Sequence, residues 1–176
     1  MAITRLNNNS ITSITALPSA VAVANTPCFR AAADQHQSIS NTTQTVIVFD
    51  YEFFDVGGCY NHTGSSTTLN GITTPAYSFA PNVAGTYYCK ASTRIQDEAD
   101  WDANEIKILK NGSAEVIRES GPNRYVNTLS CMALVELNGT SDYIHVQFYH
   151  NRGGAIQITG DVNKQLTVFE AFKIIE

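Results

Sequence analysis

The densest group of side chains that could do chemistry is an acidic run in the middle of the chain, which contains Asp97, Asp100 and Asp102. Carboxylate oxygens are ligands that calcium prefers in proteins, so these three aspartates are the candidates for a calcium site. The run lacks the central glycine and the ligand spacing of the helix–loop–helix calcium site. We therefore predict a solvated loop between strands, with calcium binding as the alternative and no other cofactor.

Trp101 stands inside the same acidic run. Tryptophan is enriched at binding hot spots, which makes Trp101 the candidate recognition residue. The alternative is a tryptophan that covers the end of a β-sandwich.

The remaining reactive side chains form no catalytic pattern in the sequence. The histidines are scattered: His36, His62, His145 and His150. No serine or cysteine stands in a nucleophile context, and His145, in an alternating strand, is predicted at the surface or an interface. Asp50, Glu52 and Asp55 could supply paired carboxylates for glycoside hydrolysis, but nothing in their spacing makes two of them converge. We predict that the chain is not an enzyme.

The four cysteines are predicted to be free rather than paired in disulfides. They are Cys28, Cys59, Cys89 and Cys131. None forms a C-x-x-C pair, and no nearby histidine completes a zinc spacing. Cys89 and Cys131 lie within apolar strands, where a free thiol behaves as a small hydrophobic side chain.

Length and charge limit the class of protein. A chain of 176 residues and 19.2 kDa is long enough for one domain with a proper core. The net charge of -5 and the pI near 5.3 argue against binding to a nucleic-acid backbone. No apolar run reaches the roughly 18 residues of a transmembrane helix, so no membrane insertion is expected. Only 15% of the residues are charged, which suits a protein that buries extra surface in an oligomer.

Residues 1–25 differ in composition from residues 26–176. They contain too few apolar residues to fold alone, and Pro18 would break a helix that started there. We interpret them as an extended N-terminal anchoring arm that belongs to the mature protein; an arm folded back on its own domain is the alternative. Its anchoring side chains would be Ile3, Leu6, Ile11, Ile14 and Leu17.

From residue 45 onward the hydrophobic pattern has a period of two. Residues 47–53 place Ile47, Phe49, Tyr51 and Phe53 on one face of a predicted strand. In residues 86–95 one face is apolar and the other is polar, which is typical of an antiparallel strand with one wet side. The dipeptide Asn111-Gly112 predicts a hairpin. Residues 129–137 are apolar on both faces, which predicts a central strand that is covered on both sides.

No segment keeps a helical spacing over three turns. Many short strands at hairpin spacing predict an all-β protein, and the jelly roll is the sandwich with about eight strands. The predicted fold is an antiparallel jelly-roll β-sandwich with an extended N-terminal arm.

Two motifs set aromatic residues around a glycine-bearing turn. They are Phe54-Asp55-Val56-Gly57-Gly58-Cys59-Tyr60-Asn61 and Phe79-Ala80-Pro81-Asn82-Val83-Ala84-Gly85-Thr86-Tyr87. Their order resembles the complement-1q-type globular head, a relative of the tumour necrosis factor jelly roll. Residues 27–31 and 168–174 look like the first and closing strands of that family. The family often has Gly-Asp before the strand at residues 143–149, whereas this chain has Asn138-Gly139-Thr140-Ser141-Asp142.

The resemblance implies a homotrimer whose protomers pack aromatic faces around a threefold axis. It makes four residues core or trimer aromatics: Tyr60, Phe79, Tyr87 and Phe172. For each of them, simple sandwich core is the alternative. The chain has no collagen-like Gly-x-y stalk and no clear secretory signal, which makes a secreted animal ligand doubtful.

The first 18 residues are similar to the openings of small virion proteins of tailed bacteriophages. There a short N-terminal arm docks on the particle, and a β-rich trimeric knob projects outward. The resemblance implies a non-enzymatic, homotrimeric structural protein at the virion surface, assembled in the host cytoplasm. It would be a capsid decoration or a short fibre head. Its partners would be other virion proteins, through the arm, and a host surface receptor or glycan.

Two other functions stay open. One is a secreted complement-1q-type ligand-binding module. The other is a polysaccharide-degrading virion spike, which would use carboxylates of the acidic run.

Overall fold

The computed structural model describes residues 25–96, 101–123 and 128–174, and it places their side chains except at positions 101, 102, 122 and 123. Within these residues the secondary structure is all strand, and every strand pairing is antiparallel. The predicted all-β class is therefore confirmed. No helix in the described parts of the chain has the length and hydrophobicity to cross a membrane. The predicted arm lies outside the described residues except for position 25, so its boundary and its anchoring side chains stay predictions.

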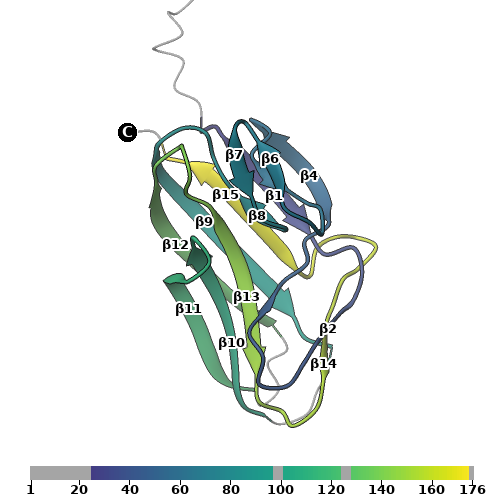
Figure 1. Cartoon of the computed structure of the whole chain (residues 1–176). Coiled ribbons are helices and arrows are strands. Elements are labelled where there is room, and N and C mark those ends of the chain that lie inside the picture. Colours follow the sequence, from purple (N-terminus) through teal and green to yellow (C-terminus); the bar gives the residue numbers. More distant parts are fainter. Residues whose placement is uncertain (1–24, 97–100, 124–127, 175–176) are drawn as a thin grey trace, which may run out of the picture.

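One sheet has five strands, and its spatial order joins distant parts of the chain (Figure 1). In that order the strands are β12 (Thr128–Leu137), β9 (Gly85–Arg94), β15 (Val168–Lys173), β1 (Cys28–Ala32) and β4 (Tyr51–Val56). The strand β15, near the end of the chain, thus lies between β1 and β9 and joins the two ends of the domain in one sheet.

The second sheet has six strands. Five follow one another in the order β11 (Ala114–Asn123), β10 (Trp101–Lys110), β13 (Ile144–His150), β8 (Ser78–Phe79) and β5 (Tyr60–Asn61). The short strand β3 (Thr45–Val46) also pairs with β13. Two small sheets complete the domain: β14 (Ile156–Ile158) with β2 (Gln37–Ile39), and β6 (Thr67–Leu69) with β7 (Ile72–Thr74).

The core lies between the two large sheets and is built by the inward residues of alternating strands. An aromatic cluster occupies its centre: Phe29 stacks on Tyr60 with ring centroids 4.3 Å apart and meets the edge of Phe169 at 4.9 Å. The Tyr60 hydroxyl donates to the carbonyl of Phe49 at 2.9 Å, which satisfies the buried phenol. This cluster joins β1 and β15 of one sheet to β5 of the other.

Two turns show why particular residues are needed. Asn111 and Gly112 have φ of 53° and 85°, as the two central residues of a type I′ hairpin require, so the predicted hairpin between β10 and β11 is confirmed. Gly139 has φ of 70°, and a Cβ there would lie 2.4 Å from the backbone nitrogen of Ala84. Only glycine fits at position 139, because the neighbouring backbone cannot move away.

Two strand predictions are wrong. Ile47 and Phe49 are buried, whereas Tyr51 and Phe53 are exposed, so residues 47–53 do not form one strand with one apolar face. The strand β4 begins only at Tyr51 and is an edge strand of the five-stranded sheet. The strand at 129–137 is not central: β12 lies at the edge of that sheet, and one of its apolar faces is exposed.

Candidate functional site

The five-stranded sheet has one face toward the core and one face toward the surroundings, and we call the second the outer face. Strand registers order its side chains in rows that cross the sheet. One row, the apolar row, runs across all five strands: Val56, Cys28, Phe172, Tyr88 and Leu134. The rings of Phe172 and Tyr88 contact each other with centroids 5.2 Å apart. An apolar row of this length on an exposed sheet face is unusual for a monomer.

The next row on the outer face is charged in its middle and apolar at its ends. Glu170 lies between two cations, with Arg30 Nε at 3.7 Å and Lys90 Nζ at 4.0 Å from its carboxylate. Phe54 and Met132 stand at the two ends of this row. The carboxylate of Glu170 compensates one of the two positive charges, so the row has a net charge of one. A partner surface could therefore cover the row without burying several unpaired ions.

At the β4 edge of the sheet a bulge increases the aromatic surface. The register between β1 and β4 shifts at Arg30 and Ala31, so that two consecutive residues of β4, Phe53 and Phe54, are both exposed. Arg30 lies over the ring of Phe53, with the guanidinium carbon 4.8 Å from the centroid. We call Tyr51, Phe53, Phe54 and Val56 the β4 patch.

At the opposite edge of the sheet a second apolar group forms the β12 patch. It consists of Leu134 and Met132 on β12, Tyr88 on β9 and Phe172 on β15. Leu134, Met132 and Phe172 are 61%, 52% and 38% exposed, and the Tyr88 hydroxyl lies 3.5 Å from Met132 Sδ. Sequence reasoning missed most of this patch because it predicted that both faces of the strand at 129–137 are covered within one chain.

The four aromatics singled out by the family resemblance separate into two groups. Tyr60, Phe79 and Tyr87 are buried in the core. Phe172 does not lie in the core, because the alternation of β15 turns Phe169 and Ala171 inward and Phe172 outward. Its other predicted role, as an aromatic of the trimer contact, stays a prediction. Phe172 instead contributes to the β12 patch.

The cysteines are free, as predicted, and three of them are buried: Cys59, Cys89 and Cys131. Burial raises the pKa of Cys89 to about 11 and that of Cys131 to about 12, so both thiols stay protonated and unreactive at neutral pH. Cys28 is partly exposed and lies in the apolar row. None of the four belongs to a redox or metal centre that the described residues form.

The calcium candidates and the recognition candidate cannot be placed. Asp97 and Asp100 lie outside the described residues, as do the side chains of Asp102 and Trp101. In the parts of the chain that the structure describes, no three histidine, cysteine or acidic side chains gather as a metal site would require. Calcium binding and a recognition role for Trp101 therefore stay predictions.

The carboxylates considered for hydrolysis are each held by a different neighbour. The carboxylate of Asp50 accepts a hydrogen bond from the backbone amide of Asp34 at 2.9 Å. The carboxylate of Asp55 accepts one from the backbone amide of Tyr60 at 2.8 Å. Glu52 lies 3.3 Å from the ring of His62. These contacts give the three carboxylates structural roles.

His145 is buried, so the prediction that it lies at the surface is wrong. Burial lowers its pKa. One ring nitrogen lies 3.1 Å from the side-chain nitrogen of Gln147, and the ring stacks beside Tyr143 with centroids 5.9 Å apart. The residue contributes to packing on β13.

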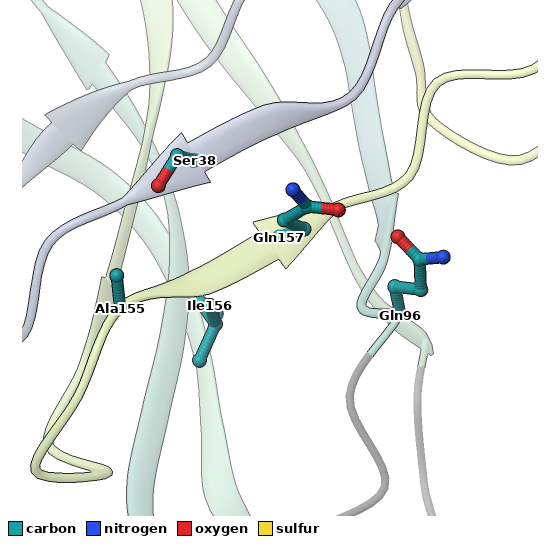
Figure 2. Close-up of a pocket in the computed structure, with 5 residues that line it drawn as sticks. All are labelled: Ser38, Gln96, Ala155, Ile156 and Gln157. Atoms are coloured by element: carbon teal, nitrogen blue, oxygen red, sulfur yellow. The ribbon is translucent and has the colours of Figure 1, made fainter.

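A cavity of about 270 Å³ opens beside the small sheet of β2 and β14. Ser38 on β2 and Gln157 on β14 line it, together with Gln96 after β9 and the residues Ala155 and Ile156 (Figure 2). Ile156 is buried beneath, and the other four residues are exposed. The described part of the lining offers two amides and one hydroxyl and no charged side chain.

A second cavity, of about 300 Å³, lies at the other end of the sandwich, where β9 begins and β10 and β12 end. Two of its charged side chains are paired: Lys110 Nζ lies 2.8 Å from Asp142 Oδ2, and it also donates to the backbone carbonyl of Glu136. Asp142 also accepts from Asn111 and from the amide of Asn138. This network joins two loops and has a structural role.

Several solved structures are similar to this chain. Murine APRIL at pH 8.5 matches with a TM-score of 0.56 and 11% identity, over 84% of this chain and 98% of APRIL. Eiger TNF from S. frugiperda matches with 0.50 and 10%, over 85% and 92%. PRD1 vertex protein P5 matches with 0.50 and 14%, over 84% and 94%. No family model matches the sequence, and no curated protein does.

At these identities the likeness concerns the fold. The predicted jelly-roll fold is confirmed by its likeness to the structures of APRIL and Eiger TNF. The finer likeness to the complement-1q head and the phage-type arm stay predictions.

Proposed function

We propose that this chain is a non-enzymatic structural protein of a bacteriophage particle, in which three copies assemble through the outer face. The observation that carries the proposal is the exposure of apolar and aromatic side chains over that face, from the β4 patch to the β12 patch. Monomeric proteins rarely expose contiguous apolar patches larger than a few hundred Å², and larger ones mark interaction sites.

The position of the two patches favours a ring over a twofold dimer. A twofold contact needs only one self-complementary surface, whereas a cyclic trimer joins two different surfaces of each copy. The β4 patch and the β12 patch lie at opposite edges of one sheet. One copy can therefore set its β4 patch on the β12 patch of the next copy, and three such contacts close a ring.

The virion role rests on two supports. The vertex protein P5 of PRD1 shares the fold, and residues 1–18 resemble the openings of tailed-phage virion proteins. In the proposed arrangement residues 1–25 dock on other particle proteins and residues 26–176 stand at the virion surface. The particle would be assembled in the host cytoplasm.

The alternative is a ligand-type module of the complement-1q class, and the fold shared with Eiger TNF favours it. Both functions use a trimer, so the mass of the assembly does not separate them. Location does: antibody labelling of intact particles finds the protein on the virion surface if the proposal is right.

Two measurements test the proposal. Light scattering of the purified chain should give three times 19.2 kDa. A chain that lacks residues 1–24 should still measure three times its own, smaller mass, and it should lose its place on particles. A stable monomer or dimer would contradict the trimer, and particles without label would contradict the virion role.

A further inference from the structure

The cavity beside β2 and β14 has the chemistry of a site for an uncharged, hydroxyl-rich ligand. Amide side chains both donate and accept hydrogen bonds, and so does a hydroxyl. Gln96, Gln157 and Ser38 all line the cavity. In Figure 2 the side-chain amides of Gln96 and Gln157 lie beside each other, and the hydroxyl of Ser38 points to the other side of Gln157. Sugar hydroxyls also donate and accept, so each can form paired hydrogen bonds with such side chains.

The lining argues against charged ligands. Phosphate and carboxylate groups are recognised by arginine, lysine or clustered backbone amides, and calcium needs several oxygen ligands that include carboxylates. Among the residues that the structure describes, the side chains that line the cavity carry no charge. With about 270 Å³ the cavity lies just below the range of about 300–1,000 Å³ that is typical of sites for drug-sized ligands, so it suits no more than one sugar ring.

The backbone that carries the side chains of the cavity is held by strand pairing and by buried neighbours. Ser38 and Gln157 are directly paired in the ladder of β2 and β14, and the amide of Gln96 donates to the carbonyl of Gln157 at 2.9 Å. Beneath them the neighbouring isoleucines Ile39, Ile156 and Ile158 are buried in the core. Groups that are held in place by strands lose little freedom when a ligand binds.

The cavity also lies at the end of the domain opposite the start of β1. The amide of Lys173 donates to the carbonyl of Pro27, and Lys173 pairs with Tyr87. Gln96 follows nine residues later, a distance of about 30 Å along an extended strand. Figure 1 shows β2 and β14 at the lower end and the start of β1 at the upper end. A particle anchored through residues 1–25 would therefore present the cavity outward.

We propose that Ser38, Gln96 and Gln157 bind a neutral sugar residue. The binding itself rests on the cavity, while its use in attachment to a host surface rests on the proposed virion role.

The test is saturation-transfer NMR on the full chain with a panel of probes: the methyl glycosides of glucose, galactose, mannose and N-acetylglucosamine. At least one probe should receive saturation. Gln96→Ala and Gln157→Ala should each weaken its binding about 3- to 10-fold, the worth of one neutral hydrogen bond or a little more. Ala155→Trp should abolish it by filling the cavity. Gln165→Ala, which removes an exposed glutamine elsewhere, should leave it unchanged.

The inference would be overturned if no probe received saturation, or if the Ala155→Trp variant bound the probe as well as the unchanged protein. These results leave the virion role intact, because labelling of particles tests that role separately. Conversely, a chain that binds the sugar in this cavity but is absent from particles overturns the virion role alone.

Discussion

Replacing Leu134 with serine should weaken the trimer strongly and leave the folded monomer almost unchanged. Leu134 is 61% exposed in the single chain. Burial of a whole leucine side chain is worth about 1.5–3 kcal/mol, so covering the exposed part gives about 1–2 kcal/mol per contact. The same residue is lost at three contacts of a ring, which amounts to about 3–6 kcal/mol, or about 100- to 10,000-fold in the equilibrium constant.

The assay is the mass of the chain measured by light scattering over a dilution series. The dissociation constant of a trimer scales with the square of concentration. The concentration at which half of the chains are monomeric should therefore rise about 10- to 100-fold in Leu134→Ser. Val162→Ser is the matched control, because Val162 is 87% exposed and lies in a loop outside the outer face. Its dilution curve should match that of the unchanged protein.

A mixing experiment tests the arrangement of the contact. Leu134→Ser keeps its β4 patch, and Phe54→Ser keeps its β12 patch. When the two variants are mixed, one intact contact joins a copy of each, so the mixture should contain dimers at concentrations where either variant alone is monomeric. If Leu134→Ser does not alter the dilution curve, or if the mixture is no more associated than its components, the assignment of the two patches is refuted.

Three further predictions concern the single domain. Phe169→Ala should lower the free energy of unfolding, measured in urea, by about 3–5 kcal/mol, because Phe169 is buried among aromatic side chains. Phe172→Ala, measured in dilute monomer, should lower it by about 1 kcal/mol or less. Equal losses would contradict the assignment of the two residues to opposite faces of the sheet. Burial raises the pKa of Asp142, but hydrogen bonds from Asn111 and Lys110 outweigh it, so its pKa lies below its ordinary value of 3.8. The resulting stability should be complete above pH 4 and lost as pH falls through the lowered pKa, and acid unfolding followed by circular dichroism should be less steep in Asp142→Asn. Cys28 should be the first thiol to react with a maleimide, since Cys59, Cys89 and Cys131 are buried; its reaction should slow at concentrations that favour the trimer, and a rate independent of concentration would place the contact elsewhere.

Local patterns predicted much of the fold. The alternation in residues 86–95 is that of β9, with Tyr87 and Cys89 inward and Tyr88 outward. The hairpin at Asn111-Gly112 followed from its two residues, because few other dipeptides adopt two positive φ angles. These features depend on nearest neighbours along the chain, so the sequence contains them directly.

The outer face could not be predicted in the same way. Apolar residues on both sides of β12 led to the prediction that one chain covers both sides, because the sequence pattern does not say what covers a strand. The exposure of Leu134 and Met132 shows that the single chain leaves one of these sides uncovered. The sequence also could not predict that Phe54 is exposed. The bulge that turns Phe54 outward depends on the pairing of β4 with β1, which joins distant segments of the chain.

The bulge in β4 has a consequence for the behaviour of the newly made chain. A sheet edge with a regular row of free amides and carbonyls invites another strand to add to it, and an aromatic edge strand is especially prone to such growth. The bulge bends β4 and breaks the regular spacing of its backbone groups. Copies can then meet through their side chains and not through continued strand pairing. The irregularity that enlarges the β4 patch thus also disfavours growth by strand addition at this edge, which suits the proposed closed ring.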